Sequence, residues 1–158
     1  MWKKLSNTIL FTLFAFFGLI ILLLFSPLIL ISTFINKIES KTLEEEYRQY
    51  LLKIDGHKLF CYNNRKHTKE FIEKQIMPIL PKDVKLIFLD GRFPVSEYPH
   101  QFTSMLLYNI RNQVGFPYLL RIQEGNVLEK SINNELYNSL NQGHDTKPLY
   151  DAINNFYQ

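Results

Sequence analysis

The sequence of 158 residues predicts an α/β domain that follows an N-terminal transmembrane helix. Residues 9–35 (ILFTLFAFFGLIILLLFSPLILISTFI) contain no charged side chain. A helix needs only about 20 such residues to cross the ~30 Å hydrocarbon core of a bilayer. After residue 35, segments with helical periodicity alternate with short apolar runs that are typical of strands. This alternation predicts the α/β class for the rest of the chain.

The apolar run is predicted to be an uncleaved, single-pass anchor. A secretory signal has an apolar region of about 7 to 15 residues and a small-x-small cleavage site, whereas this run is longer and holds alanine only at Ala15. Residues 1–8 form a short basic N-terminus with Lys3 and Lys4. Basic residues nearly balance on the two sides of the span, and the basic start favours a cytoplasmic N-terminus. The domain is therefore expected on the extracytoplasmic side of the membrane.

Composition limits the function of residues 36–158, which are enough for one domain. The chain has 18 basic and 15 acidic residues, and Lys3 and Lys4 account for most of the excess, so no nucleic-acid partner is expected. The single cysteine, Cys61, excludes an internal disulfide and a cysteine-based zinc site. The four histidines show no ligand spacing, and no nucleotide-binding or Gly-x-Ser-x-Gly motif occurs. The sequence thus predicts no metal and no cofactor. Abundant Asn, Lys, Ile, Phe and Tyr with few alanines is typical of an AT-rich genome, and a bacterial source is expected.

The first elements after the span are a helix, a strand and a second helix. Residues 36–56 are predicted to be a linker with an amphipathic helix over 43–54, which begins at a capping box, Thr42 to Glu45, and ends at Asp55-Gly56. Residues 57–62 (HKLFCY) follow as a strand. Thr68 is expected to cap a helix that runs to about Leu80 and is kinked by Pro78. Its inward positions are Phe71, Ile72, Ile76 and Ile79.

The second half of the domain is predicted to contain a buried strand, a helix, a hairpin and two more helices. Residues 84–89 (VKLIFL) are a continuous apolar run that is typical of a strand covered on both faces. A loop with two prolines leads to a helix near 100–112. The runs 116–122 and 126–132 form a hairpin around Gly125. A short helix at 134–140 and a last helix with Pro148 in its first turn complete the chain.

Three segments resemble the thioredoxin-like fold superfamily over residues 57–158. DVKLIFLDG at 83–91 is similar to the second core strand of that fold, and IMPIL at 76–80 is similar to the kinked first helix. VGFPYLLRIQEGNV at 114–127 is similar to the proline that leads into the hairpin. The resemblance implies a thioredoxin-like, three-layer α/β domain in which Pro117 is a cis-proline that faces the active site.

The chain departs from this family in its chemistry. Redox members carry Cys-x-x-Cys at the start of the first helix, where the helix dipole lowers a thiol pKa. By the resemblance this motif would fall near residues 70–73, which contain no cysteine, and residue 118 is tyrosine in place of threonine. Cys61 lies inside a predicted strand, where it is expected to be a buried apolar filler rather than a nucleophile. Dithiol exchange is therefore not expected.

Polar residues near the start of the predicted 68–80 helix are the candidate binding residues. Helix-start amides favour anions, although a solvated capping loop explains the same residues. Glu70 and Glu73 share a helical face and would suit paired carboxylates or simple surface solubility. Asp90 ends a strand and is either a site residue or a turn cap. The candidates are Arg65, Lys66, His67, Thr68, Glu70 and Pro117.

The leading hypothesis is a membrane-anchored, redox-inactive, thioredoxin-like binding domain whose partner is a protein or peptide. One alternative is an enzyme in which His67, Glu70 or Cys61 acts without a partner cysteine, for instance a membrane-bound thiol oxidoreductase or peroxidase that uses Cys61 alone. Another alternative is an accessory subunit of a membrane complex, in which the span carries the function. No catalytic residue is assigned by the sequence.

Overall fold

The computed structural model describes residues 2–141 and 145–158. The chain divides into two compact units: the first ends at Glu45, and the second runs from Glu46 to Gln158. The first unit consists of most of α1 (Trp2–Lys53), a helix of 52 residues. The side chains of Lys3 and Lys4, predicted to form a basic start, lie outside the part that is described. Within the described part of the chain, no helix combines the length and the apolar character needed to cross a membrane.

The prediction that a new helix begins at Thr42 is wrong, because α1 continues through this position. The Thr42 hydroxyl donates to the carbonyl oxygen of Ile38 at 3.1 Å, which is the bond that threonine makes inside a helix and not at its start. Residues 41–46 contain neither glycine nor proline, so nothing stops the helix there. The predicted end of the helix is confirmed: α1 stops at Lys53, and Gly56 has a φ of +81°.

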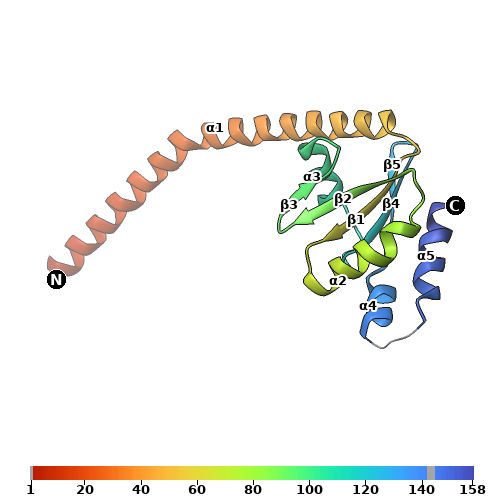
Figure 1. Ribbon diagram of the computed structural model, residues 1–158. Coiled ribbons are helices and arrows are strands. Elements are labelled where there is room, and N and C mark those ends of the chain that lie inside the picture. The colour runs from red at the N-terminus through yellow and green to blue at the C-terminus, as the bar shows by residue number, and fades with distance from the viewer. Residues whose placement is uncertain (1, 142–144) are drawn as a thin grey trace. The chain divides into compact units, whose positions relative to one another are not determined.

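The second unit is an α/β domain built on one five-stranded mixed sheet (Figure 1), so the predicted α/β class is confirmed. The strand order is β3-β2-β1-β4-β5. β1 pairs with β2 in parallel, and the other three pairs are antiparallel. The strands are β1 (Lys58–Asn63), β2 (Val84–Asp90), β3 (Phe93–Val95), β4 (Tyr118–Gln123) and β5 (Asn126–Ser131).

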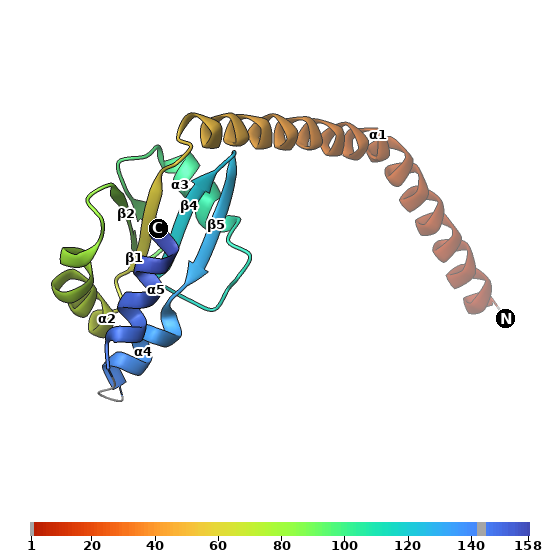
Figure 2. The ribbon, with the colours of Figure 1, turned by 90° about the vertical axis from the view of Figure 1, so that its right-hand side faces the viewer.

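Helices cover both faces of this sheet, because residues along each strand point alternately to opposite sides. Figures 1 and 2 show α2, α4 and α5 on one face and α3 on the other. Leu59 and Cys61 of β1 lie in the core on the α3 side, together with Leu51 from the end of α1. Phe60 and Tyr62 lie in the core on the opposite side. The helices are α2 (Lys66–Phe71), α3 (His100–Tyr108), α4 (Asn133–Asn141) and α5 (Lys147–Tyr157).

The helix predicted over 68–80 is broken into three pieces. α2 is followed by a π-helix, η1 (Ile72–Ile76), and a 3-10 helix, η2 (Met77–Ile79). Pro78 explains the break, because proline lacks an amide hydrogen and its ring clashes with the carbonyl of the preceding turn. Ile72 and Ile76 are buried as predicted, whereas Ile79 is 41% exposed, so its predicted inward position is wrong.

Strand β3 was not predicted from the sequence, which indicated a loop there. It is a three-residue edge strand that pairs Pro94 with Leu89 of β2, and an edge is where a sheet tolerates proline. The prediction that residues 84–89 are covered on both faces is confirmed in part. Ile87 is buried in the core on the α3 side, and Val84 and Phe88 pack against the core on the opposite side. Leu86 remains 40% exposed.

The predicted hairpin is confirmed, since β4 and β5 pair from Tyr118–Ser131 to Gln123–Asn126. Gly125 in its turn has a φ of +70°, and an added Cβ would lie 2.9 Å from Cδ2 of Leu52. Both the backbone conformation and the space therefore require glycine here. The predicted 100–112 helix is shorter, because α3 ends at Tyr108.

Candidate functional site

The candidate site lies at the end of the sheet where β1 and β2 both finish. These parallel strands pair up to Asn63 and Leu89. Asn64 then joins the two ends: its backbone N–H donates to the carbonyl of Leu89 at 3.2 Å, and its Nδ2 donates to Oδ1 of Asp90 at 2.9 Å. Asp90 therefore holds the loop between β1 and α2. The sequence did not indicate this contact, since it offered only a site residue or a cap of the following turn for Asp90.

Pro117 lies at the same end of the sheet. The pairing of β1 with β4 ends at Cys61 and Tyr118, and one further step in this register brings Pro117 opposite Tyr62. The Phe116–Pro117 peptide bond is cis, as the resemblance implies, and Pro117 is buried. The Tyr118 hydroxyl accepts from the Gly115 amide at 3.0 Å and donates to the Asn112 carbonyl at 2.9 Å. The segment before Pro117 is thus tied to β4.

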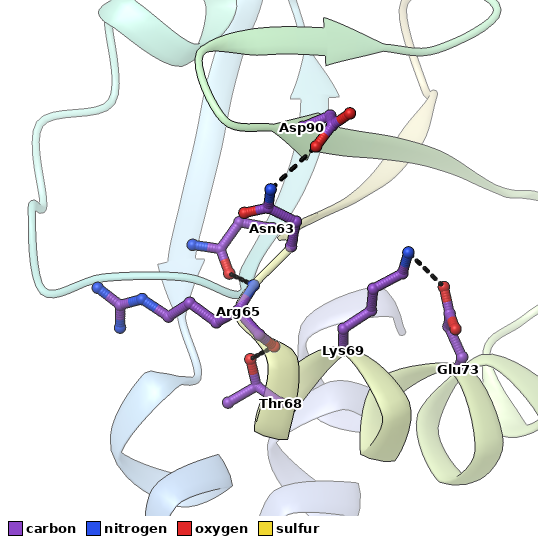
Figure 3. Close-up of polar contacts among 7 residues, drawn as sticks. Asn63, Arg65, Thr68, Lys69, Glu73 and Asp90 are labelled. Atoms are coloured by element: carbon purple, nitrogen blue, oxygen red, sulfur yellow. Dashed lines mark hydrogen bonds and ion pairs between the residues drawn. The ribbon is translucent and has the colours of Figure 1, made fainter.

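The start of α2 does not have the predicted cap. Arg65 is the N-cap residue and makes no side-chain capping bond. Thr68 lies within the first turn, where its buried hydroxyl donates to the Arg65 carbonyl at 3.0 Å (Figure 3). The Arg65 amide in turn donates to Oδ1 of Asn63 at 3.4 Å. The hydroxyl of Thr68 is therefore used by the helix itself, and Asn63 is a positioning residue that the sequence did not single out.

A hollow of about 520 Å³ opens beside the start of α2. Arg65 contacts its far side directly, since its Nη1 donates to the hydroxyl of Tyr137 on α4 at 3.2 Å. Tyr137 and Leu140 were not predicted as site residues. Their i, i+3 spacing places them on one face of α4, but only the packing of α4 beside α2 brings them to the hollow. It is lined by Arg65, Lys66, His67, Thr68, Tyr137 and Leu140.

Glu70 and Glu73 do not act as a pair, because each contacts a lysine one turn away. Lys74 Nζ lies 2.7 Å from Oε1 of Glu70, and Lys69 Nζ lies 3.8 Å from Oε1 of Glu73. The hydrogen bond and charge of Lys74 lower the pKa of Glu70. Both lysine–glutamate pairs are exposed, so water and salt screen them. Glu70 lines a shallow surface beside His67.

Cys61 is fully buried in the middle of β1. Burial raises the pKa of its thiol well above the ordinary value, so at neutral pH the thiol is protonated. A thiolate is the reactive form of cysteine. The burial of Cys61 as an apolar filler, expected from its position in the strand, is confirmed.

Within the described residues, no cluster of three or more histidine, cysteine, aspartate or glutamate side chains has the geometry to hold a metal ion. His144, one of the four histidines, lies outside the described residues. The site offers a partly apolar hollow with positive charges beside the braced loop, and Pro117 does not line this hollow. Comparison of the chain with protein-family models, with curated proteins and with solved structures finds no match.

Proposed function

We propose that this chain is a membrane-anchored binding domain of thioredoxin-like fold that performs no dithiol chemistry. The fold assignment is supported by the strand order β2-β1-β4-β5, in which a parallel β1-α2-β2 unit is joined by the antiparallel hairpin β4-β5. This is the arrangement that the resemblance implies. The additional edge strand β3 extends it on the outer side of β2.

One observation carries the proposed binding function: the braced loop at 63–65, the hollow beside α2 and the buried Pro117 all belong to the same end of the sheet. A surface built from several fixed segments suits recognition of a partner, because little conformational freedom is lost on binding. A protein or peptide is the proposed partner. Catalysis is disfavoured by the burial of Cys61 and by the pairing of Glu70 with Lys74.

The proposed anchor is supported by the apolar surface of the first unit. Large side chains there are turned to the outside, among them Phe11 at 75%, Phe14 at 70% and Phe34 at 66% exposure. Apolar surface of this extent marks contact with a membrane or a partner, and residues 9–35 have the composition of a membrane-spanning segment. The proposed topology places the domain on the extracytoplasmic side.

Cross-linking in intact membranes tests the binding function. We expect the full chain to cross-link to a partner, and the double variant Arg65→Glu with Lys66→Glu to lose this product. Lys82→Glu is the control for charge reversal elsewhere on the domain, because Lys82 is exposed and precedes β2 at the opposite end of the sheet. Equal cross-linking by the double variant would place binding elsewhere and contradict the proposal.

Insulin reduction tests the absence of thiol chemistry. The full chain in detergent is expected to give no turnover above buffer, because the Cys61 thiol is buried. Turnover that disappears in Cys61→Ala would instead identify a one-cysteine oxidoreductase and overturn the redox-inactive assignment.

A further inference from the structure

We propose that the hollow between α2 and α4 binds a carboxylate-bearing segment of a partner protein. This inference rests on the proposed binding function and names the chemistry of the partner. The lining contains two basic side chains, Arg65 and Lys66, and one histidine, His67. Among the described residues that line the hollow, none is acidic.

The positive charge of the hollow is not neutralised by the protein itself. Lys66 makes no ion pair within the described part of the chain, and the Arg65 guanidinium donates to a neutral hydroxyl, that of Tyr137. The next two cations along the chain differ, since Lys69 and Lys74 are paired with Glu73 and Glu70. The unpaired charge is thus confined to the first two positions at the hollow. Opposite charge on the partner is the complement that such a surface selects.

The hollow also has apolar walls, which a simple inorganic anion would not use. Leu140 and the ring of Tyr137 form part of its lining. Its volume of about 520 Å³ lies within the range of about 300 to 1,000 Å³ that is typical of sites for organic ligands. An acidic side chain or a chain terminus next to an apolar residue matches both features. We therefore favour a peptide segment over a free anion.

Arg65 is held in place before any ligand arrives. Its amide is bonded to Asn63, and its carbonyl accepts from Thr68. Figure 3 shows its side chain extending away from Lys69 and Glu73, and its guanidinium reaches Tyr137 on α4. One N–H group of the guanidinium is used by this contact, and a guanidinium has five. The remaining donors are available for a carboxylate, for which the planar fork is well suited.

Fluorescence polarisation with a short fluorescein-labelled peptide of alternating glutamate and leucine tests the inference. The full chain in non-ionic detergent is expected to bind this peptide and not the same peptide with lysine in place of glutamate. Arg65→Glu and Lys66→Glu are each expected to weaken binding about tenfold or more, and high salt is expected to weaken it further. Lys82→Glu changes the net charge equally and is expected to leave binding unaltered. Circular dichroism confirms that each variant is folded.

The outcomes separate this inference from the proposed function. Equal binding of the glutamate and lysine peptides, or an affinity that Arg65→Glu with Lys66→Glu leaves unchanged, would overturn the carboxylate assignment. If the membrane cross-link is nevertheless lost in that double variant, the binding function stands. Complete displacement of the peptide by inorganic phosphate at the same concentration would also overturn the peptide assignment. A peptide of alternating serine and leucine is expected to bind more weakly than the glutamate peptide. If Arg65→Glu and Lys66→Glu both still bind the serine peptide, the apolar walls contribute to binding.

Discussion

The two units of the chain use the same kinds of side chain in opposite ways. In the first unit Phe14 is 70% exposed, whereas in the second unit Phe60 is fully buried. A single helix has no second layer to cover its side chains, while a sheet between two layers of helices covers residues on both faces. The second unit therefore buries its own large apolar side chains, whereas those of the first unit remain exposed.

The largest expected effect comes from a cavity in the core that lies on the α2, α4 and α5 side of the sheet. Phe60→Ala should lower the free energy of unfolding of the domain by about 3 to 5 kcal/mol, because it leaves a cavity in a close-packed interior. Phe14→Ala is the matched control and should leave the unfolding of the domain unchanged, since Phe14 is exposed and belongs to the first unit. Chemical denaturation followed by circular dichroism measures both. A large effect of Phe14→Ala would mean that the first unit stabilises the second.

A charge in the first unit tests what surrounds it. Leu19 is 59% exposed, and if residues 9–35 cross a bilayer, Leu19→Arg should disfavour insertion by about 2.5 to 3.5 kcal/mol. We expect this variant to move from the membrane pellet to the alkaline-extracted supernatant. Thr42→Arg is the control, because Thr42 is exposed and lies beyond the apolar run. Retention of Leu19→Arg in the pellet would contradict the proposed anchor.

A moderate effect is expected from the buried tyrosine of α5. The Tyr157 hydroxyl donates to the Leu59 carbonyl of the central strand at 2.6 Å, and Tyr157→Phe should cost about 1 kcal/mol of stability. Burial raises the pKa of Tyr157 above its ordinary value of 10.0, so above pH 10 the unfolded chain loses this proton before the folded one. Stability should therefore fall as the pH rises above 10. Denaturation measured from about pH 8 to about pH 11 should show a shallower fall of the free energy of unfolding for Tyr157→Phe. An unchanged slope in this variant would rule out the contribution of Tyr157.

The smallest effect is expected at the exposed pair of Glu70 and Lys74. Glu70→Gln removes the 2.7 Å ion pair, yet exposed pairs contribute little because water and salt screen them. The free energy of unfolding and the affinity for the acidic peptide should both stay within experimental error. Denaturation and polarisation titrations measure the two quantities. A clear loss of peptide affinity would extend the binding site along α2 beyond the hollow.

Local sequence patterns predicted the elements whose signals lie within a few residues. The β4-β5 hairpin follows from two apolar runs around Gly125, and the burial of Cys61 follows from its place in a short apolar strand. Both threonine caps were predicted wrongly. A threonine hydroxyl can bond to the backbone at a helix start or inside the helix, and Thr42 and Thr68 both make the internal bond.

The candidate site was predicted only in part. The cationic segment from Arg65 to Thr68 was visible because its residues are consecutive, and the position of Pro117 followed from the resemblance. Tyr137 and Leu140 were missed, because no local pattern indicates that α4 packs beside α2. The edge strand β3 was missed for a related reason, since Pro94 is tolerated there only because its outer side has no further strand.

By itself the sequence determined the apolar character of residues 9–35, the α/β class of the domain and the lack of a dithiol motif, because composition and short-range periodicity encode these properties. Only the tertiary structure decided that Arg65 meets Tyr137 across a hollow and that Asn64 joins the ends of β1 and β2 through Asp90. Such contacts form only when elements that are distant in the sequence pack together. The burial of apolar surface across the whole domain selects that packing.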